Sequence, residues 1–245
     1  MSTMPRQFFH GTPNRFSRMG VACAALMVVA GCQKHGASSE WFPLQDGDEQ
    51  TYGALYEGDE PTAFETWHME VHGPVTYGDD KVMVRHHSAG ANYYIKTDEE
   101  GIRRVALRTD IDREPTPDNE PRWVLKAPYT VGTEWTTPTV PYLIRRRNEH
   151  PRELKYTHQV LMNWRIDAVD EEVRTEAGTF KPCLRVEGVA KVNIYVDPVQ
   201  GFTDVPLLAT EWYCKGKGLV KLIRKETVPQ GFFTGGVLTA ELIDP

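Results

Sequence analysis

Hydrophobic and polar residues alternate along much of this chain, most clearly between Leu184 and Val196. Every even position there is apolar or glycine, whereas most odd positions carry charged or polar side chains. A period of two is typical of a half-buried β-strand, because successive side chains point to opposite faces of the sheet. The stretch predicts one strand about 40 Å long, or strands separated by a hairpin or bulge near Gly188.

Strand-like patterns also fill the first half of the chain. In residues 63–73, Trp67, Met69 and Val71 fall on one face, and short polar turns lead to further alternating runs at 81–87, 92–97 and 102–109. Four such runs with tight connections predict an antiparallel meander. By contrast, Pro115, Pro117 and Pro121 indicate a surface loop over 110–122.

The second half continues with strands. Residues 154–173 are ambiguous, and we interpret them as a strand, with a helix as the alternative. Residues 207–218, 218–228 and 235–245 follow the alternating segment as three more strands, and the charges of 218–228 are expected to face outward. The chain therefore belongs to the mainly β class, with few or no long helices.

The amino-terminal segment has a different pattern. Three arginines and no acidic residue precede the ten-residue apolar run Val21–Ala30, which is too short for a transmembrane helix of about 20 residues. A basic segment followed by a short apolar run is typical of a secretory signal peptide. The residues that follow, Val29-Ala30-Gly31-Cys32, resemble the lipobox of bacterial lipoproteins. That resemblance implies cleavage after Gly31 and lipid attachment to Cys32.

These features divide the chain into three parts. We expect a signal peptide over residues 1–31, a lipidated tether over 32–40 and a single β-rich periplasmic domain over 41–245. In lipoproteins, aspartate directly after the lipidated cysteine favours the inner membrane, and this chain has Gln33 there. The resemblance therefore implies the periplasmic face of the outer membrane, with the lipid on Cys32 making the membrane contact.

Composition narrows the possible partners. Loss of residues 1–31 removes three arginines and no acids, so the formal net charge moves from −6 to −9. Nucleic acid is not expected as a partner, because binding to phosphates needs clustered Lys and Arg. Of the four cysteines, Cys183 and Cys214 remain in the domain. An oxidising compartment permits a disulfide between them, which would close a loop of about 30 residues. Two free buried thiols are the alternative.

Two linked motifs raise a second resemblance. The segments 176–188 (EAGTFKPCLRVEG) and 211–226 (EWYCKGKGLVKLIRKE), with Trp135 in the earlier VGTEW, resemble a large group of poorly characterised bacterial lipoproteins. The resemblance covers roughly the second half of the domain. It implies a single antiparallel, strongly curved sheet or half-open barrel. It carries over no catalytic residue.

Catalytic candidates are few. His68, Glu70 and His72 would project from one strand face and could hold a metal with help from His86 or His87. Ser88 is the only serine after the tether and lacks the GxSxG context of a hydrolase.

We therefore expect a non-catalytic, membrane-anchored envelope lipoprotein without cofactor or metal. It would bind a partner protein or an apolar ligand, such as a lipid, on its curved sheet. The alternative is a periplasmic enzyme with a His-centred metal site. An apolar concavity lined by Trp67, Trp164 and Trp212 would favour the binding function.

Overall fold

The computed structural model describes residues 37–58, 61–146, 159–229 and 231–244. The chain divides into two compact units, residues 1–34 and 35–245, and all of the described residues belong to the second. The predicted signal peptide, Gly31 and Cys32 therefore lie outside the described residues.

The described residues form one short helix and a series of strands. Helix α1 covers Ala37–Trp41, and the strands are β1 (Glu49–Gly58), β2 (Ala63–Tyr77), β3 (Asp80–His87), β4 (Ala91–Asp98), β5 (Gly101–Thr109), β6 (Thr116–Lys126), β7 (Glu134–Thr139), β8 (Arg145–Arg146), β9 (Val160–Thr175), β10 (Gly178–Asp197), β11 (Gly201–Cys214), β12 (Gly218–Glu226), β13 (Phe233–Thr234) and β14 (Gly236–Asp244). Helix α1 occupies the last part of the expected tether.

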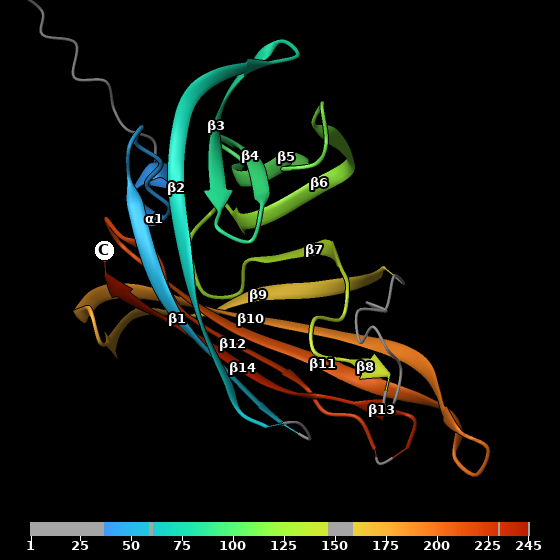
Figure 1. Cartoon of the computed structure of the whole chain (residues 1–245). Helices are drawn as coiled ribbons and strands as arrows, with labels where there is room; N and C mark the ends of the chain where they lie inside the picture. The colour runs from blue at the N-terminus through green and yellow to red at the C-terminus, as the bar shows by residue number, and fades with distance from the viewer. Residues whose placement is uncertain (1–36, 59–60, 147–158, 230, 245) are drawn as a thin grey trace, which may run out of the picture. The chain divides into compact units, whose positions relative to one another are not determined.

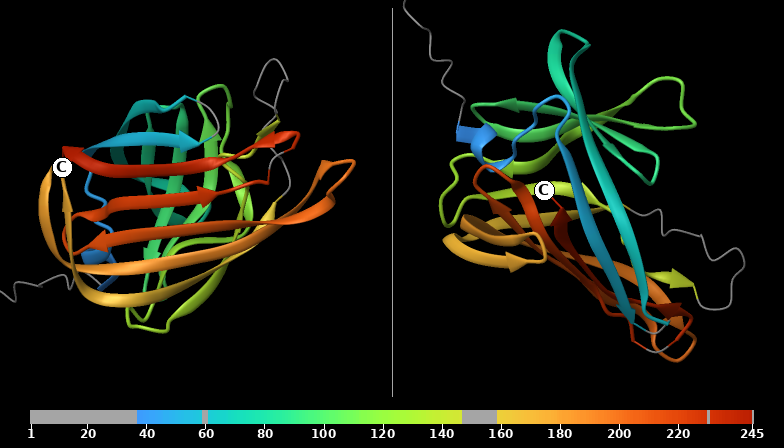
Figure 2. Two further views of the ribbon diagram at one scale, coloured as in Figure 1. Left: turned by 90° about the horizontal axis from the view of Figure 1, so that it is seen from below. Right: turned by 60° about the vertical axis from the view of Figure 1, so that its left-hand side comes forward.

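Twelve strands form one antiparallel sheet in the order β6-β5-β4-β3-β2-β1-β14-β12-β11-β10-β9-β7. The sheet curves so strongly that β3 to β6 lie over β9 to β11, as Figure 1 and Figure 2 show. The end strands β6 and β7 approach each other without pairing in the sheet. Two contacts join them: Arg122 Nη1 donates to the Pro138 carbonyl (2.8 Å) and Thr137 Oγ1 to the Trp123 carbonyl (3.3 Å). The predicted half-open barrel is confirmed.

The alternation between Leu184 and Val196 corresponds to a half-buried strand, as the sequence predicts. All the even positions from Leu184 to Val196 are buried on β10, which runs unbroken from Gly178 to Asp197. Its register shifts against β9 come before Gly188. Glycine is needed at position 188 because a Cβ there would lie 2.7 Å from the Trp164 ring. The single long strand is therefore the correct alternative.

The prediction of a surface loop over residues 110–122 is wrong for its second half. Residues 116–126 form β6, and the meander runs from β2 through β6. Two facts accommodate its prolines: β6 is an end strand, and its register with β5 shifts between Arg104 and Ala106. Proline lacks an N–H group, so it is tolerated at edges and bulges, where the sheet does not need that donor.

Residues 160–175 form strand β9, so the strand interpretation of this ambiguous segment is correct over that range. Residues 147–158 lie outside the described residues. The expectation that 218–228 turns its charges outward is wrong at two positions. Arg224 and Glu226 are buried together with Val220, because the even positions of β12 face into the protein.

Apolar side chains fill the space between the two halves of the sheet. One cluster joins β4, β5 and β6 to β9, β10 and β11, and its buried members are Phe42, Ile95, Ile102, Leu125, Trp135, Ile166, Leu184, Val186 and Tyr213. A second covers the other end of β9, β10 and β11 and includes Ile144 and Phe233. Because burial of one such side chain contributes about 1.5–3 kcal/mol, these clusters stabilise the curved sheet.

Candidate functional site

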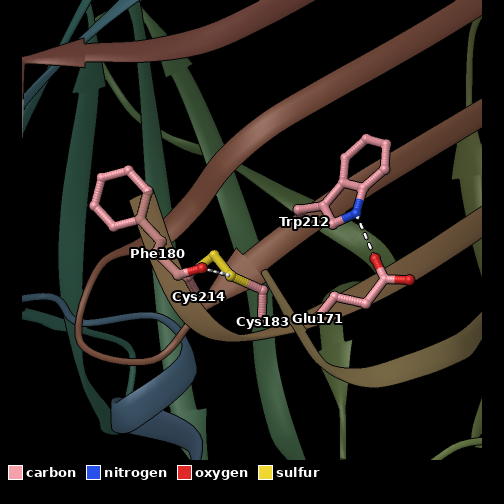
Figure 3. Close-up of a disulfide and its surroundings, with 5 residues drawn as sticks. All are labelled: Glu171, Phe180, Cys183, Trp212 and Cys214. Carbon is pink, nitrogen blue, oxygen red and sulfur yellow. Dashed lines mark hydrogen bonds between the residues drawn. A yellow bond between two sulfur atoms is a disulfide. The ribbon is translucent and has the colours of Figure 1, made fainter. Parts of the chain in front are cut away.

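The structure joins Cys183 and Cys214 in a disulfide, which Figure 3 shows. The two cysteines face each other on β10 and β11, and both are buried. The Cys183 sulfur lies 3.3 Å from the Phe180 carbonyl oxygen, a packing contact because a disulfide sulfur carries no proton to donate. Both sulfur atoms are in the bridge, so neither residue offers a free thiolate as a metal ligand, and the bridge links β10 to β11 covalently.

The disulfide lies where the β9–β10 hairpin reaches across the sheet. Beyond it, the Ala177 N–H donates to the Leu242 carbonyl of β14 at 3.2 Å. Trp212 lies beside the bridge, and its indole Nε1 donates to Glu171 at 2.9 Å (Figure 3). The disulfide and this hydrogen bond therefore hold the end of the hairpin against its neighbouring strands.

The histidines considered as metal ligands have separate partners. His72 pairs with Glu70 at 3.4 Å, whereas the His86 ring lies 3.2 Å from the Asn92 side-chain oxygen. On the other face of β3, His87 accepts a hydrogen bond from the Ala89 N–H, and burial followed by the charge of Arg85 lowers its pKa. Within the described ranges, no three His, Cys, Asp or Glu side chains are placed to share a metal ion.

The tryptophans do not form a common concavity. Trp164 packs against both main core clusters, and Trp67 packs against the clusters around Tyr52 and Ala54. Trp212 also packs against the cluster around Tyr52, but Trp164 does not; the Lys221 ammonium lies 5.9 Å from the Trp212 ring, and the Trp212 indole donates to Glu171. The expected lining of three tryptophans is therefore not present in this arrangement.

A polar cluster lies between β1, β3 and β12. Arg85 Nη2 donates to Gln50 (2.8 Å) and to the Tyr52 hydroxyl (3.1 Å), and its guanidinium lies 5.1 Å from the Phe42 ring. The Tyr52 hydroxyl donates to the Leu219 carbonyl at 2.7 Å. Burial raises the Tyr52 pKa despite the opposing charge of Arg85. These contacts fix β1 against β3 and β12.

Glu211 is a half-buried carboxyl with a shifted pKa. It accepts a 2.5 Å hydrogen bond from the Tyr213 hydroxyl, and Tyr213 packs against Phe42 at 6.1 Å between ring centroids. Burial raises the Glu211 pKa, while the Tyr213 hydrogen bond and the charge of Arg224 oppose that rise. Burial and the carboxylate together raise the Tyr213 pKa well above its usual value.

Glu226 holds the segment 140–144 inside the barrel. It is 0% exposed and accepts hydrogen bonds from the N–H groups of Tyr142 (2.9 Å) and Leu143 (2.8 Å), with that of Ile144 at 3.3 Å. Arg224 Nε donates to the same carboxylate at 2.8 Å. Sequence reasoning missed this pair, although two charges spaced two apart on an alternating strand were a signal that both share one face.

A pocket of about 480 Å³ lies at the open seam between β5–β6 and β7–β9. We call it the seam pocket. Its charged wall contains Arg104, Asp118 and Arg122, and its apolar side includes Leu107 and Val160. Asp118 lies within the stretch that the sequence analysis assigned to a loop, so this site could not be found without the register of β6.

Exposed apolar side chains lie along one face of the β10–β11 hairpin, in two cross-strand pairs and at the turn. Val189 lies opposite Leu208, and Tyr195 lies opposite Phe202 with ring centroids 5.4 Å apart. Together with Val199 at the turn, each of these side chains is at least 40% exposed. We call these five residues the outer hairpin face, and in Figure 1 the hairpin extends to the lower right, away from α1.

These features define a half-open antiparallel barrel with a pocket at its seam and an exposed apolar hairpin. The sequence matches no protein-family model and no curated protein. The structure is similar to a protein from Parabacteroides distasonis assigned as a lipoprotein (TM-score 0.44, 13% identity, 83% of this chain and 97% of the other). It is also similar to an exported protein with YmcC-like fold from Bacteroides fragilis (TM-score 0.36, 13% identity, 82% and 96%).

The described residues contain no helix of the length and apolarity needed to span a membrane.

Proposed function

We propose that this protein is a non-catalytic lipoprotein of the bacterial cell envelope that binds a partner protein through its outer hairpin face. The lipobox supports the anchor, because Gly31-Cys32 follows a short apolar run and a basic leader. Gln33 supports the periplasmic face of the outer membrane. Helix α1 begins at Ala37, so four residues of sequence separate it from Cys32.

The observation that carries the binding proposal is the exposure of two opposed apolar pairs on one hairpin. Phe202 is 71% exposed, and the Val189–Leu208 pair is 49% and 40% exposed. The two pairs are separated by Lys191–Pro206 and Asn193–Asp204. Exposed apolar side chains grouped on one face mark sites of interaction, and aromatic residues are enriched in the centres of such sites. Asn193 and Asp204, hydrogen-bonded at 2.8 Å between the two pairs, would supply polar contacts.

A partner protein fits the structure better than an acyl chain held within the sheet. The space between the two halves is filled by packed side chains such as Ile102, Leu184 and Met162, all at 0% exposure. An acyl chain would have to displace them. The outer hairpin face instead needs no rearrangement, because its side chains are already in solvent.

Site-specific photocrosslinking tests the partner. A benzoylphenylalanine residue at position 202 is compared with one at position 64, because Phe64 is an equally exposed aromatic residue on β2 (65%). In intact cells we expect a discrete protein adduct from position 202 and not from 64. The same adducts from both positions, no adduct from position 202, or a lipid adduct identified by mass spectrometry would contradict the proposal.

The anchor is tested separately. Cys32→Ala should move the protein from the membrane fraction to the soluble fraction or leave an uncleaved leader, and should abolish labelling by radioactive palmitate. Gln33→Asp is the matched variant for location, because it keeps the lipidated cysteine. It should shift the protein from the outer towards the inner membrane on a sucrose gradient. An unchanged palmitate signal in Cys32→Ala would exclude lipid attachment at this residue.

A further inference from the structure

We infer that the seam pocket binds a single-chain anionic amphiphile, with its acidic head group at Arg104 and Arg122 and its chain along the apolar side. This inference goes beyond the proposed function, because it concerns a different surface and a small ligand. A volume of about 480 Å³ lies within the usual range for small-molecule sites.

The charged wall favours an anion. Arg104 and Arg122 face each other across β5 and β6, an arrangement of like charges that is unfavourable unless an anion lies between them. Asp118 is that anion: it accepts hydrogen bonds from Arg104 Nε and Nη2 at 2.8 and 2.7 Å and lies 2.9 Å from Arg122 Nε. One carboxylate thus balances two guanidinium groups.

The remaining positive charge faces the pocket. The side chains of Arg104 and Arg122 are 17% and 23% exposed, whereas that of Asp118 is 9% exposed. Glu120, the other carboxylate of the lining, is exposed, and both arginines pair with Asp118 rather than with it. A guanidinium binds carboxylate and phosphate in a bidentate geometry, so a second anionic group is the ligand that this wall suits.

The rest of the lining is suited to a hydrocarbon chain. Leu107, Val160 and Leu161 border the pocket together with Pro117 and Pro138. Leu161 is 60% exposed, so a chain lying against it would remove apolar surface from water. A peptide strand added between β6 and β7 is less suitable, because Pro117 and Pro138 have no N–H to donate to it.

A photoreactive fatty acid tests this inference on the native lipoprotein in isolated membranes. Dodecanoate carrying a diazirine group on its chain is activated, and the labelled peptides are mapped by mass spectrometry. We expect labelling near Leu107 and Leu161 that excess dodecanoate abolishes. Dodecyltrimethylammonium, which has the same chain and the opposite charge, and acetate, which has no chain, should compete at least tenfold less effectively.

Variants distinguish the pocket from nonspecific adsorption. Arg104→Gln and Arg122→Gln should each lower the labelling at least tenfold. Arg103→Gln is the matched control, because Arg103 is the neighbouring residue and is engaged elsewhere, with Asp98 and over the Trp123 ring. Its labelling should remain within twofold of the wild type. Leu161→Gln changes an exposed residue, so it should fold normally and weaken labelling several-fold.

Three results would overturn the inference. These are labelling confined to peptides outside the pocket, equal competition by dodecyltrimethylammonium, and equal losses in Arg103→Gln and Arg104→Gln. If Arg104→Gln lowers the amount of folded protein, Leu161→Gln is compared with the wild type instead. Unchanged labelling of Leu161→Gln would also reject the site. The crosslinks from position 202 are independent of these outcomes.

Discussion

Glu226 and Asp118 both pair with arginine, but they differ in what else they contact. Glu226 is completely buried, and one guanidinium together with consecutive main-chain N–H groups accounts for its bonds. Asp118 is slightly exposed and is bound by two guanidinium groups. The first carboxylate is thus balanced by one cation and by the main chain, whereas the second leaves positive charge in excess.

This difference separates a structural ion pair from a candidate binding site. The Glu226 contacts bring Leu143 and Ile144 into two apolar clusters, so the charge positions the segment 140–144. The Asp118 contacts keep two like charges close together beside a pocket. A fully buried ion pair with balanced charge stabilises the fold. An ion-pair cluster with excess positive charge beside a pocket can in addition bind an anionic ligand.

The largest effect is expected from Glu226→Leu. The change leaves the Arg224 guanidinium buried at 2% exposure without its carboxylate. Loss of one member of a buried pair costs about 3–5 kcal/mol. Urea unfolding of the purified protein should show that loss. The double variant Arg224→Met/Glu226→Leu should recover only part of it, because the N–H groups of the segment 140–144 still lack an acceptor. A loss below about 1 kcal/mol would show that the pair does not position this segment.

The disulfide should have the next largest effect. Cys183→Ala/Cys214→Ala opens a loop with a sequence separation of 31. In the chain-entropy account this lowers the free energy of unfolding by roughly 3.5 kcal/mol. Thermal unfolding measures the loss, and the matched control is the reduced wild-type protein, which should unfold at a similarly lowered temperature. Equal melting temperatures of variant and oxidised wild type would show that packing alone holds the hairpin.

Much of the fold could be predicted from the sequence because burial follows a period of two. Residues 184–196 alternate so regularly that one face of β10 could be assigned residue by residue. The prolines of 110–122 misled the prediction, because proline is excluded only from paired central strands and β6 is an end strand. The strands β6 and β7 follow each other in the sequence but stand at opposite ends of the strand order. No local pattern of residues indicates that β6 is an end strand.

The sites were harder to predict than the strands. The sequence placed Cys183 and Cys214 in strands but left their pairing open, because the register of β10 against β11 decides it. The seam pocket depends on Arg104 and Arg122 being opposite each other, which follows from a register shift in β6 that no local pattern indicates. Side chains on β10 could thus be assigned to a face, whereas sites made by several strands could not be assembled.

Asp118→Asn should have a smaller effect on stability than the Glu226 variant, about 1–2 kcal/mol, because its contacts are charge-assisted but partly exposed. The remaining repulsion between Arg104 and Arg122 is open to solvent. Millimolar phosphate should therefore restore much of the lost melting temperature in Asp118→Asn and none in Glu226→Leu. If phosphate raised the melting temperatures of the two variants equally, the Asp118 cluster would not differ from the Glu226 cluster in its ability to bind an anion.

Glu211→Gln should give the smallest change, and it should be a gain. Burial raises the pKa of the Glu211 carboxyl, whereas in the unfolded chain the group ionises near 4.5. Between these two pKa values the folded protein binds more protons, so its stability falls as the pH rises from 4.5 through the raised pKa. Glutamine keeps an acceptor for the Tyr213 hydroxyl and does not ionise. The variant and the wild type should therefore melt at similar temperatures at pH 4, and the variant should melt at the higher temperature at pH 8. A difference that does not change with pH would mean that the Glu211 carboxyl is solvated like a surface group, unlike Glu226.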